Sequence, residues 1–94
     1  MKTVGQIIKD ARLKKRFSLK RVEDLTKIKV GFIELIEKEK WANLPPFPTV
    51  LGFVKSLATT LDLDQSFVVA VLRRDYPPRK LSINPKPDVS PQGS

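Results

Sequence analysis

The chain has 94 residues, which favours a single domain, and it contains neither cysteine nor histidine. Disulfides, thiolate ligands and imidazole groups are therefore excluded, which leaves little chemistry for a catalytic or metal site. The formal net charge is +8, and residues 1–40 hold 12 of the 18 lysines and arginines against six acids, so the positive charge is concentrated in the first half of the chain.

The first predicted helix covers about residues 4–15. Thr3 and Gln6 have the spacing of a capping box, which places the helix start near Val4. The cations of "RLKKR" fall at its C-terminal end, where the helix dipole favours them. Its apolar stripe has helical spacing and consists of Val4, Ile7, Ile8 and Ala11.

Two short helices joined by a tight turn follow, the outline of a helix-turn-helix. Ser18 is the expected N-cap of the first, and Thr26 and Lys27 form the turn before a second helix at about residues 29–38. The residues expected to face inward are Leu19, Val22, Leu25, Ile28, Phe32, Ile33 and Ile36. Trp41 and Leu44 are expected to close over the end of the second helix.

The segment "NLPPFP" is predicted to be non-helical because its prolines remove donors and restrict the residues before them. A fourth helix should start near Pro48 or Thr49, and Asp64 should cap a fifth. Their inward residues are predicted to be Val50, Val54, Leu57, Ala58, Leu61, Phe67, Val68, Val71 and Leu72. The sum is an all-α fold, a compact five-helix bundle containing a helix-turn-helix.

The chain divides into a domain at residues 1–75 and a proline-rich tail at residues 76–94, expected to be a flexible linker. No apolar run approaches the roughly 20 residues that span a bilayer, and the N-terminus lacks the apolar core of a signal peptide. These features predict a cytoplasmic chain. No cofactor, metal or small-molecule ligand is expected.

The motifs resemble a known family. The segment "SLKRVEDLTKIKVGFIELIEKEKW" resembles helix-turn-helix domains of the Cro and phage-repressor type, which are lambda-repressor-like in fold. The run that continues through "LPPFPTVLGFVKSLATTLDLD" resembles the N-terminal cytoplasmic domain of the RodZ family. The shared features are "TKI" at the turn, "IE" near the end of the third helix, "LP" after the loop, "GF" in the fourth helix and "LDLD" before the fifth.

This resemblance implies a module that binds the actin-like filament protein MreB in bacterial cell-shape control. RodZ proteins cross the inner membrane once, so the resemblance also implies one of two alternatives: a parent protein whose span is not present in this chain, or a soluble relative of the family. In that family, an aromatic pair around "RGF" or "RGY" in the fourth helix meets the filament protein. The corresponding positions here are Thr49, Leu51 and Phe53, of which only Phe53 and the preceding glycine match.

Phe53 is predicted to lie at the edge of the apolar stripe, about 85° from its centre. Two interpretations follow. It is either a partly exposed interface anchor beside Leu51, or an ordinary core residue under the loop at residues 45–48.

DNA binding is the alternative function. The outward arc of the third helix carries Gly31, Glu34 and Lys38, with Lys27 and Lys29 near its start. Glu34 would repel phosphates, although it could accept from cytosine, and glycine makes no side-chain contact. The surface lacks the arginine, glutamine or asparagine that usually reads bases.

A basic corner is predicted where the first two helices meet, and its residues are Arg12, Lys14, Lys15, Arg16, Lys20 and Arg21. It could hold DNA phosphates in a salt-sensitive manner, with Arg16, Lys20 and Arg21 as candidates. Lys20 and Arg21 could equally steer an acidic protein partner, the corner could face an anionic membrane, or it could simply be solvated. Glu23 stands where such domains usually place alanine, so it should reach solvent or a cation such as Lys27.

Overall fold

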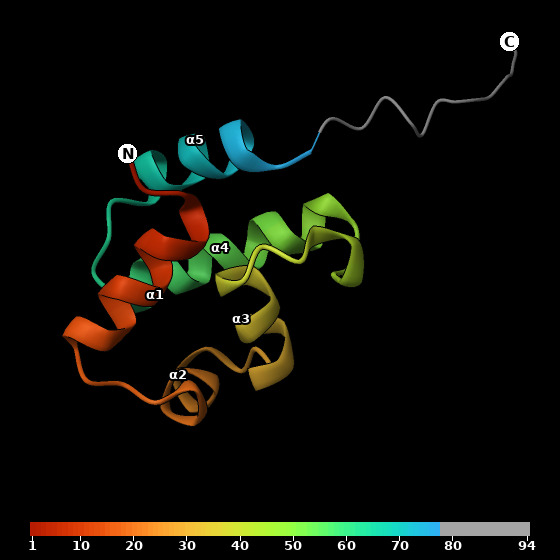
Figure 1. Cartoon of the computed structure of the whole chain (residues 1–94). Helices are drawn as coiled ribbons and strands as arrows, with labels where there is room; N and C mark the ends of the chain where they lie inside the picture. Colours follow the sequence, from red (N-terminus) through yellow and green to blue (C-terminus); the bar gives the residue numbers. More distant parts are fainter. Residues whose placement is uncertain (78–94) are drawn as a thin grey trace, which may run out of the picture.

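The computed structural model describes residues 1–77, which form five α-helices and one short 3₁₀ turn (Figure 1). The elements are α1 (Val4–Lys14), α2 (Leu19–Thr26), α3 (Val30–Glu37), η1 (Trp41–Asn43), α4 (Phe47–Thr60) and α5 (Gln65–Asp75). This part of the chain has no strand, so the predicted all-α class is confirmed. Apart from Tyr76 and Pro77, the predicted flexible tail lies outside the described residues.

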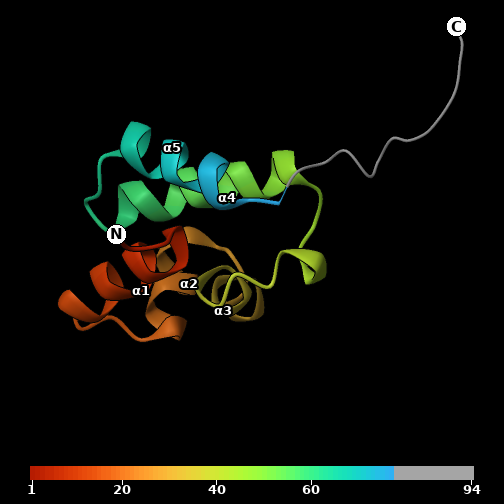
Figure 2. The ribbon, with the colours of Figure 1, turned by 45° about the horizontal axis from the view of Figure 1, so that its top comes forward.

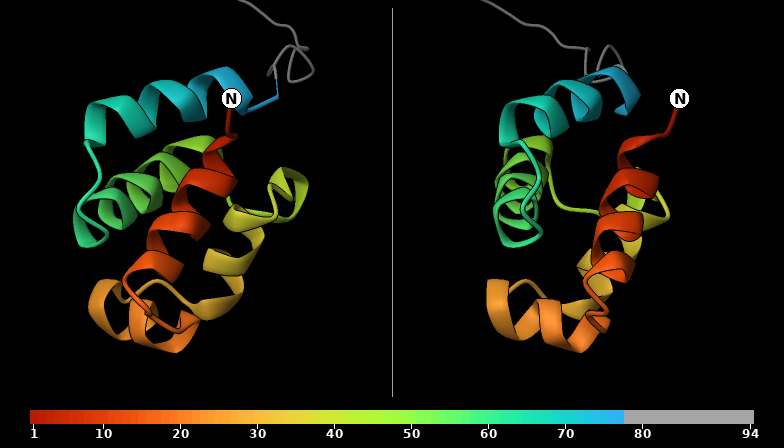
Figure 3. Two further views of the ribbon diagram at one scale, coloured as in Figure 1. Left: turned by 60° about the vertical axis from the view of Figure 1, so that its left-hand side comes forward. Right: turned by 90° about the vertical axis from the view of Figure 1, so that its left-hand side faces the viewer.

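The helices form two layers around one core. Figure 2 shows α4 and α5 together on one side and α1, α2 and α3 on the other. The two views of Figure 3 show the start of α1 beside the C-terminal half of α5. The helix-turn-helix of α2 and α3 is thus held against α4 and α1 respectively.

The core confirms most of the predicted stripes. The buried apolar residues are Val4, Ile8, Val22, Ile28, Ile33, Ile36, Val50, Val54, Leu57, Ala58, Leu61, Val68, Val71 and Leu72. Every α-helix contributes to this set, so displacing any helix from the bundle would expose apolar surface. Trp41 and Leu44 pack against its edge, and the Trp41 ring lies 5.1 Å from that of Tyr76, measured between centroids.

Two residues predicted to face inward are exposed instead. Leu25 is 44% exposed and Phe67 is 50% exposed. At about 100° per residue, Phe67 points about 100° away from its buried neighbour Val68. Leu25 lies about 90° from the middle of the face that α2 turns to the core, which is centred on Leu19, Val22 and Thr26. Both predictions were wrong because an apolar residue beside a stripe was counted as part of it.

The boundary of α4 also differs from the prediction. The helix begins at Phe47, so the last two residues of "NLPPFP" are helical after all, and Pro48 lies in the first turn. The N–H groups of a first turn have no acceptor within the helix, so proline loses no hydrogen bond there. The preceding Pro46 is the N-cap residue.

Predicted caps hold the starts of α1, α2 and α5 in place. The Thr3–Gln6 capping box is present, and the side chains of Ser18 and Asp64 accept from backbone N–H groups at the starts of α2 and α5. The helix-turn-helix turn is closed by Lys27, which adopts the left-handed conformation at φ 67° where glycine is common. The Thr26 hydroxyl donates to the Val22 carbonyl at 2.7 Å and accepts from the Ile28 N–H at 3.1 Å.

Acidic side chains from distant segments cap the start of α1. The Val4 N–H donates to Asp75 Oδ2 at 2.7 Å, and the Gly5 N–H donates to Glu39 Oε2 at 2.8 Å. These bonds satisfy donors that an isolated helix leaves open, and they place negative charge at the positive end of the helix dipole. They also tie the first turn of α1 to the end of α5 and to the segment that follows α3.

The pKa of Asp75 is held below its ordinary value of 3.8, first by the hydrogen bond from Arg74 and then by the Val4 N–H. Asp75 therefore stabilises the fold above its ordinary pKa, and this contribution is lost as the pH falls through the lower folded value. We expect Asp75→Asn to reduce the free energy of unfolding by about 1–2 kcal/mol at pH 7. The loss should shrink at pH values below 3.8.

Urea denaturation of both proteins across the acid range measures this effect. Asp10→Asn is the matched control, because Asp10 is half exposed and its ion pair with Lys2 lies on the surface. A difference between wild type and Asp75→Asn that stays constant from neutral pH to strongly acidic pH would contradict the assignment.

None of the helices in residues 1–77 has both the length and the apolar character needed to cross a membrane.

Candidate functional site

The outward side of α3 carries an apolar hollow. The helix starts after the turn at Lys27, and its N-cap residue Lys29 makes no side-chain cap bond. The hollow has a volume of about 210 Å³ and is lined by Lys29, Gly31, Phe32 and Leu35. We call it the α3 hollow. Its walls are apolar and it has one cation at its rim, so it suits an apolar side chain with an acidic neighbour.

Gly31 keeps this hollow open. A Cβ atom built on Gly31 would meet nothing within 4 Å, so no packing contact within the described residues requires a glycine here. Its φ is not positive either, so the turn geometry does not require one. Glycine within a helix nevertheless costs roughly 1 kcal/mol relative to alanine. The missing side chain therefore has a cost in stability and leaves Phe32 and Leu35 accessible.

An aromatic pair joins the α3 hollow to α4. The rings of Phe32 and Phe53 are stacked, with centroids 5.5 Å apart and planes at 30°. Both side chains are partly buried and pack against the edge of the core. Phe53 is thus an edge residue of α4, as its angle from the stripe predicted, and its ring partner is Phe32. Truncating Phe53 would remove the ring that packs against Phe32, and Phe32 forms part of the wall of the α3 hollow.

The other two predicted α4 residues lie in different surroundings. Thr49 is exposed and lies one turn before Phe53, on the same side of the helix. Leu51 is partly buried against the core, and two residues apart on a helix do not share a face. The structure therefore brings Thr49 and Phe53 to one side of α4 and does not bring Leu51 to them.

The basic corner is less uniform than its sequence suggested. Arg12 is buried rather than solvated, because its guanidinium forms a two-bond pair with the Glu37 carboxylate at 2.7 and 3.0 Å. It also donates to the Phe17 carbonyl at 2.9 Å. The inclusion of Arg12 among the surface cations was wrong, since Glu37 and the Phe17 carbonyl give this charge a partner inside the fold.

Lys20 supplies the partner of Glu23. Its ammonium lies 3.2 Å from Glu23 and 3.4 Å from Asp24, and the hydrogen bonds to these carboxylates raise the pKa of Lys20. The expected Lys27–Glu23 contact is replaced by this pair, since Lys20 precedes Glu23 by one helical turn. Arg21 instead lies against the Phe17 ring, 5.9 Å from its centroid, and Arg16 is exposed just beyond α1.

The DNA-binding candidates on α3 fall into two groups. Lys27 and Lys29 are exposed at its start. Further along, Lys38 pairs with Glu34 at 3.2 Å on the surface, so the acid and the cation largely cancel. Two exposed lysines and an internally neutralised pair leave α3 without the forked or amide donors that read base edges.

Leu35 lines the α3 hollow but was not predicted from the sequence as a site residue. It lies three residues after Phe32 and thus shares a side of α3 with it, outside the buried pair Ile33 and Ile36. An apolar residue off the buried stripe and next to a helix glycine is the signal that could have identified the hollow. Within residues 1–77, no three acidic side chains gather closely enough to hold a metal ion.

Comparison with known proteins identifies the architecture. Residues 7–68 match the family model described as a helix-turn-helix domain. The chain is 32% identical over 69 residues to the cytoskeleton protein RodZ of Streptococcus pneumoniae. That match covers 72% of this chain and 25% of the relative, so the chain spans about a quarter of the relative's length.

A solved structure has the same fold. The chain resembles YmfM of Staphylococcus aureus, which is described as a candidate DNA-binding membrane protein, with a TM-score of 0.75. The likeness covers 85% of this chain and 98% of that one at 24% identity, a level that establishes the fold alone. The predicted helix-turn-helix architecture is thereby confirmed.

Proposed function

The chain is a RodZ-like member of the helix-turn-helix domain family, and from this premise we propose that it is a protein-interaction module for an actin-like filament protein of the MreB type. Residues 1–75 form the binding domain in this proposal, and the tail links it to a membrane span elsewhere in a longer parent protein. The domain then acts in the cytoplasm, where it connects the filament to the membrane in cell-shape control. This role involves no catalysis.

The observation that carries the proposal is the α3 hollow with the aromatic pair behind it. Protein interfaces are anchored by a few aromatic and apolar side chains in desolvated pockets. Here Gly31 opens such a pocket, and the stacked rings of Phe32 and Phe53 support it from two helices. Thr49 extends the same side of α4, while Arg21 at the basic corner would assist association electrostatically. The predicted contribution of Lys20 is reduced, because Glu23 and Asp24 offset its charge.

Phe53→Ala tests this proposal. We expect it to lower the affinity for the MreB protein of the same cell by about ten-fold or more, as for the truncation of an aromatic anchor. The measurement is a pull-down followed by titration, with circular dichroism to verify the fold. Phe67→Ala is the matched control, because Phe67 is equally aromatic and half exposed but lies on α5. Equal losses in the two variants, or no binding by the wild type, would contradict the proposal.

A second variant separates binding from folding. Gly31→Ala should raise the free energy of unfolding by up to about 1 kcal/mol, since alanine favours a helix and its methyl group meets no atom. The same methyl group narrows the α3 hollow, so filament binding should weaken. A stabilised variant with undiminished binding would place the filament contact elsewhere.

The alternative function is that of a DNA-binding regulator of the Cro and phage-repressor type. The exposed Lys27 and Lys29 at the start of α3, together with Arg16 and Arg21, are the observations that favour it. A regulator would bind duplex DNA with a steep salt dependence and a preferred sequence. A gel-shift assay at two salt concentrations distinguishes sequence-specific DNA binding from binding by charge alone. Binding that is independent of the DNA sequence and is lost at moderate salt indicates charge alone. A preferred sequence that depends on Lys29, Glu34 or Lys38 would favour the regulator.

A further inference from the structure

We propose that the outward side of α1 is a docking surface for an anionic lipid bilayer. The surface consists of Lys9, Leu13, Lys14 and Arg16, and we call it the α1 surface. It shares no residue with the α3 hollow, so it stands or fails independently of the filament-binding proposal.

Leu13 is the centre of this surface. It is 52% exposed, and at about 100° per residue it points about 125° away from the middle of the buried side of α1. Lys9 precedes it by four residues and therefore lies beside it on the helix. Arg16 follows the end of α1 in the left-handed conformation, and its backbone N–H donates to the Leu13 carbonyl at 2.9 Å, so this residue also lies close to Leu13. A single exposed leucine is ordinary on a protein surface. An exposed leucine on the outward side of a helix, with cations near it, is the pattern that requires an explanation.

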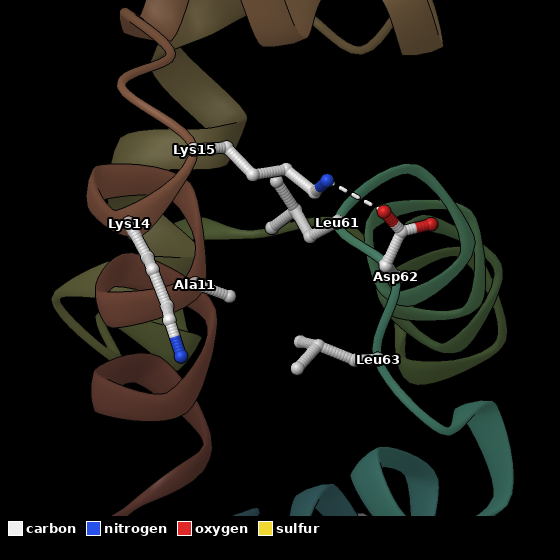
Figure 4. Close-up of a pocket in the computed structure, with 6 residues that line it drawn as sticks. All are labelled: Ala11, Lys14, Lys15, Leu61, Asp62 and Leu63. Atoms are coloured by element: carbon white, nitrogen blue, oxygen red, sulfur yellow. Dashed lines mark ion pairs between the residues drawn. The ribbon is translucent and has the colours of Figure 1, made fainter.

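The charge of the α1 surface is not cancelled by nearby acids. Within residues 1–77, the ammonium and guanidinium groups of Lys9, Lys14 and Arg16 have no carboxylate within ion-pair distance. Asp10, the neighbour of Lys9 in the sequence, pairs with Lys2, and Asp62 pairs with Lys15. Figure 4 shows the Lys14 side chain lying along α1, apart from the Lys15–Asp62 pair.

Apolar surface continues beside Lys14. A hollow of about 330 Å³ lies between α1 and the turn that joins α4 to α5, and Ala11, Leu61 and Leu63 point into it (Figure 4). Lys14 and Lys15 stand on its α1 side. Asp62 also lines the hollow, where it pairs with Lys15. An apolar floor with the Lys14 ammonium beside it suits an amphiphile with an anionic headgroup, the chemistry of an anionic phospholipid.

A bilayer explains this composition better than DNA does. Phosphates on a duplex are bound by cations and polar donors, and Leu13 would add nothing to such contacts. At a bilayer interface the leucine enters the headgroup region while lysine and arginine remain among the lipid phosphates. Each cation near an anionic leaflet strengthens attachment, so the leucine and its neighbours act together.

Vesicle co-sedimentation tests the proposal, with phosphatidylcholine vesicles that either contain or lack phosphatidylglycerol. We expect binding only to the vesicles with phosphatidylglycerol. Lys9→Gln with Lys14→Gln should weaken it by about five-fold for each cation removed. Leu13→Ser should weaken it by about five-fold, as for the loss of a partly inserted leucine. Lys40→Gln with Lys55→Gln is the charge-matched control outside α1 and should retain binding within about two-fold, since screening limits distant charges.

Several results would overturn the bilayer assignment. Unchanged binding by Leu13→Ser would mean that charge alone is responsible. Equal losses of vesicle binding in the control variant and in the variant of Lys9 and Lys14 would mean that the protein does not bind through one particular face. Failure to bind the anionic vesicles, with retention on duplex DNA or polyglutamate through Lys9 and Lys14, would assign the α1 surface to nucleic acid or to an acidic protein. Each result leaves filament binding through the α3 hollow unaffected.

Discussion

Replacing Glu37 with leucine is expected to lower the free energy of unfolding by about 3–5 kcal/mol, because it leaves the Arg12 guanidinium buried without a counter-charge. The side chains of Arg12 and Glu37 are only 10% and 5% exposed, so water cannot replace the lost carboxylate. Domains of this size have a total stability of about 5–15 kcal/mol. The variant should therefore show a much lower urea midpoint and could be unfolded at physiological temperature.

A double variant distinguishes the cost of one unpaired buried charge from the contribution of the intact pair to stability. Arg12→Met combined with Glu37→Leu should recover most of the stability, because both charges are removed together and the site stays filled with apolar atoms. Some loss should remain because the Phe17 carbonyl loses its donor from Arg12.

The surface pair is the control for this cycle. Glu34→Leu should change the free energy of unfolding by less than about 1 kcal/mol, since Glu34 pairs with Lys38 in solvent. Equal effects of Glu34→Leu and Glu37→Leu, or a double variant as unstable as Glu37→Leu alone, would contradict the account of the buried pair.

Gly5→Ala is expected to reduce the free energy of unfolding by about 3 kcal/mol, at the upper end of what overpacking usually costs. A Cβ atom on Gly5 would lie 2.4 Å from the Glu37 carbonyl oxygen and 2.8 Å from Glu39 Cγ. The nearest atom belongs to the backbone and cannot rotate away, so α1 and the end of α3 must separate. That movement also breaks the bond from the Gly5 N–H to Glu39.

Gly52→Ala provides the matched control, because its added Cβ would meet nothing within 4 Å. It should leave the urea midpoint unchanged or raise it slightly, since alanine favours a helix. A Gly5→Ala protein as stable as Gly52→Ala would show that α1 and α3 are not in close contact at Gly5.

Both large effects arise where α1 meets the C-terminal half of α3. The buried Arg12–Glu37 pair and the close backbone approach at Gly5 attach the inward side of α3 to α1. The α3 hollow lies on its outward side. Variants at the junction would therefore disturb folding and binding together, whereas Gly31→Ala and Phe53→Ala are the informative changes for function.

Much of this fold follows from the sequence by itself. Capping residues and helical periodicity depend on neighbours within a few positions, so Thr3, Ser18 and Asp64 marked their helices correctly. Most of the core stripes were confirmed for the same reason, and the match to the family model confirmed the helix-turn-helix resemblance. The roles assigned to Thr49, Leu51 and Phe53, and to the DNA-binding candidates, remain predictions.

The side-chain contacts between different helices were known only from the tertiary structure. Arg12 and Glu37 are 25 residues apart, and the Phe32 and Phe53 rings belong to different helices. No local pattern specifies such partners, because they depend on how the helices cross and how closely their backbones approach. Periodicity determines which side of a helix faces inward, while packing determines which buried charge meets which, and where a glycine leaves a surface open.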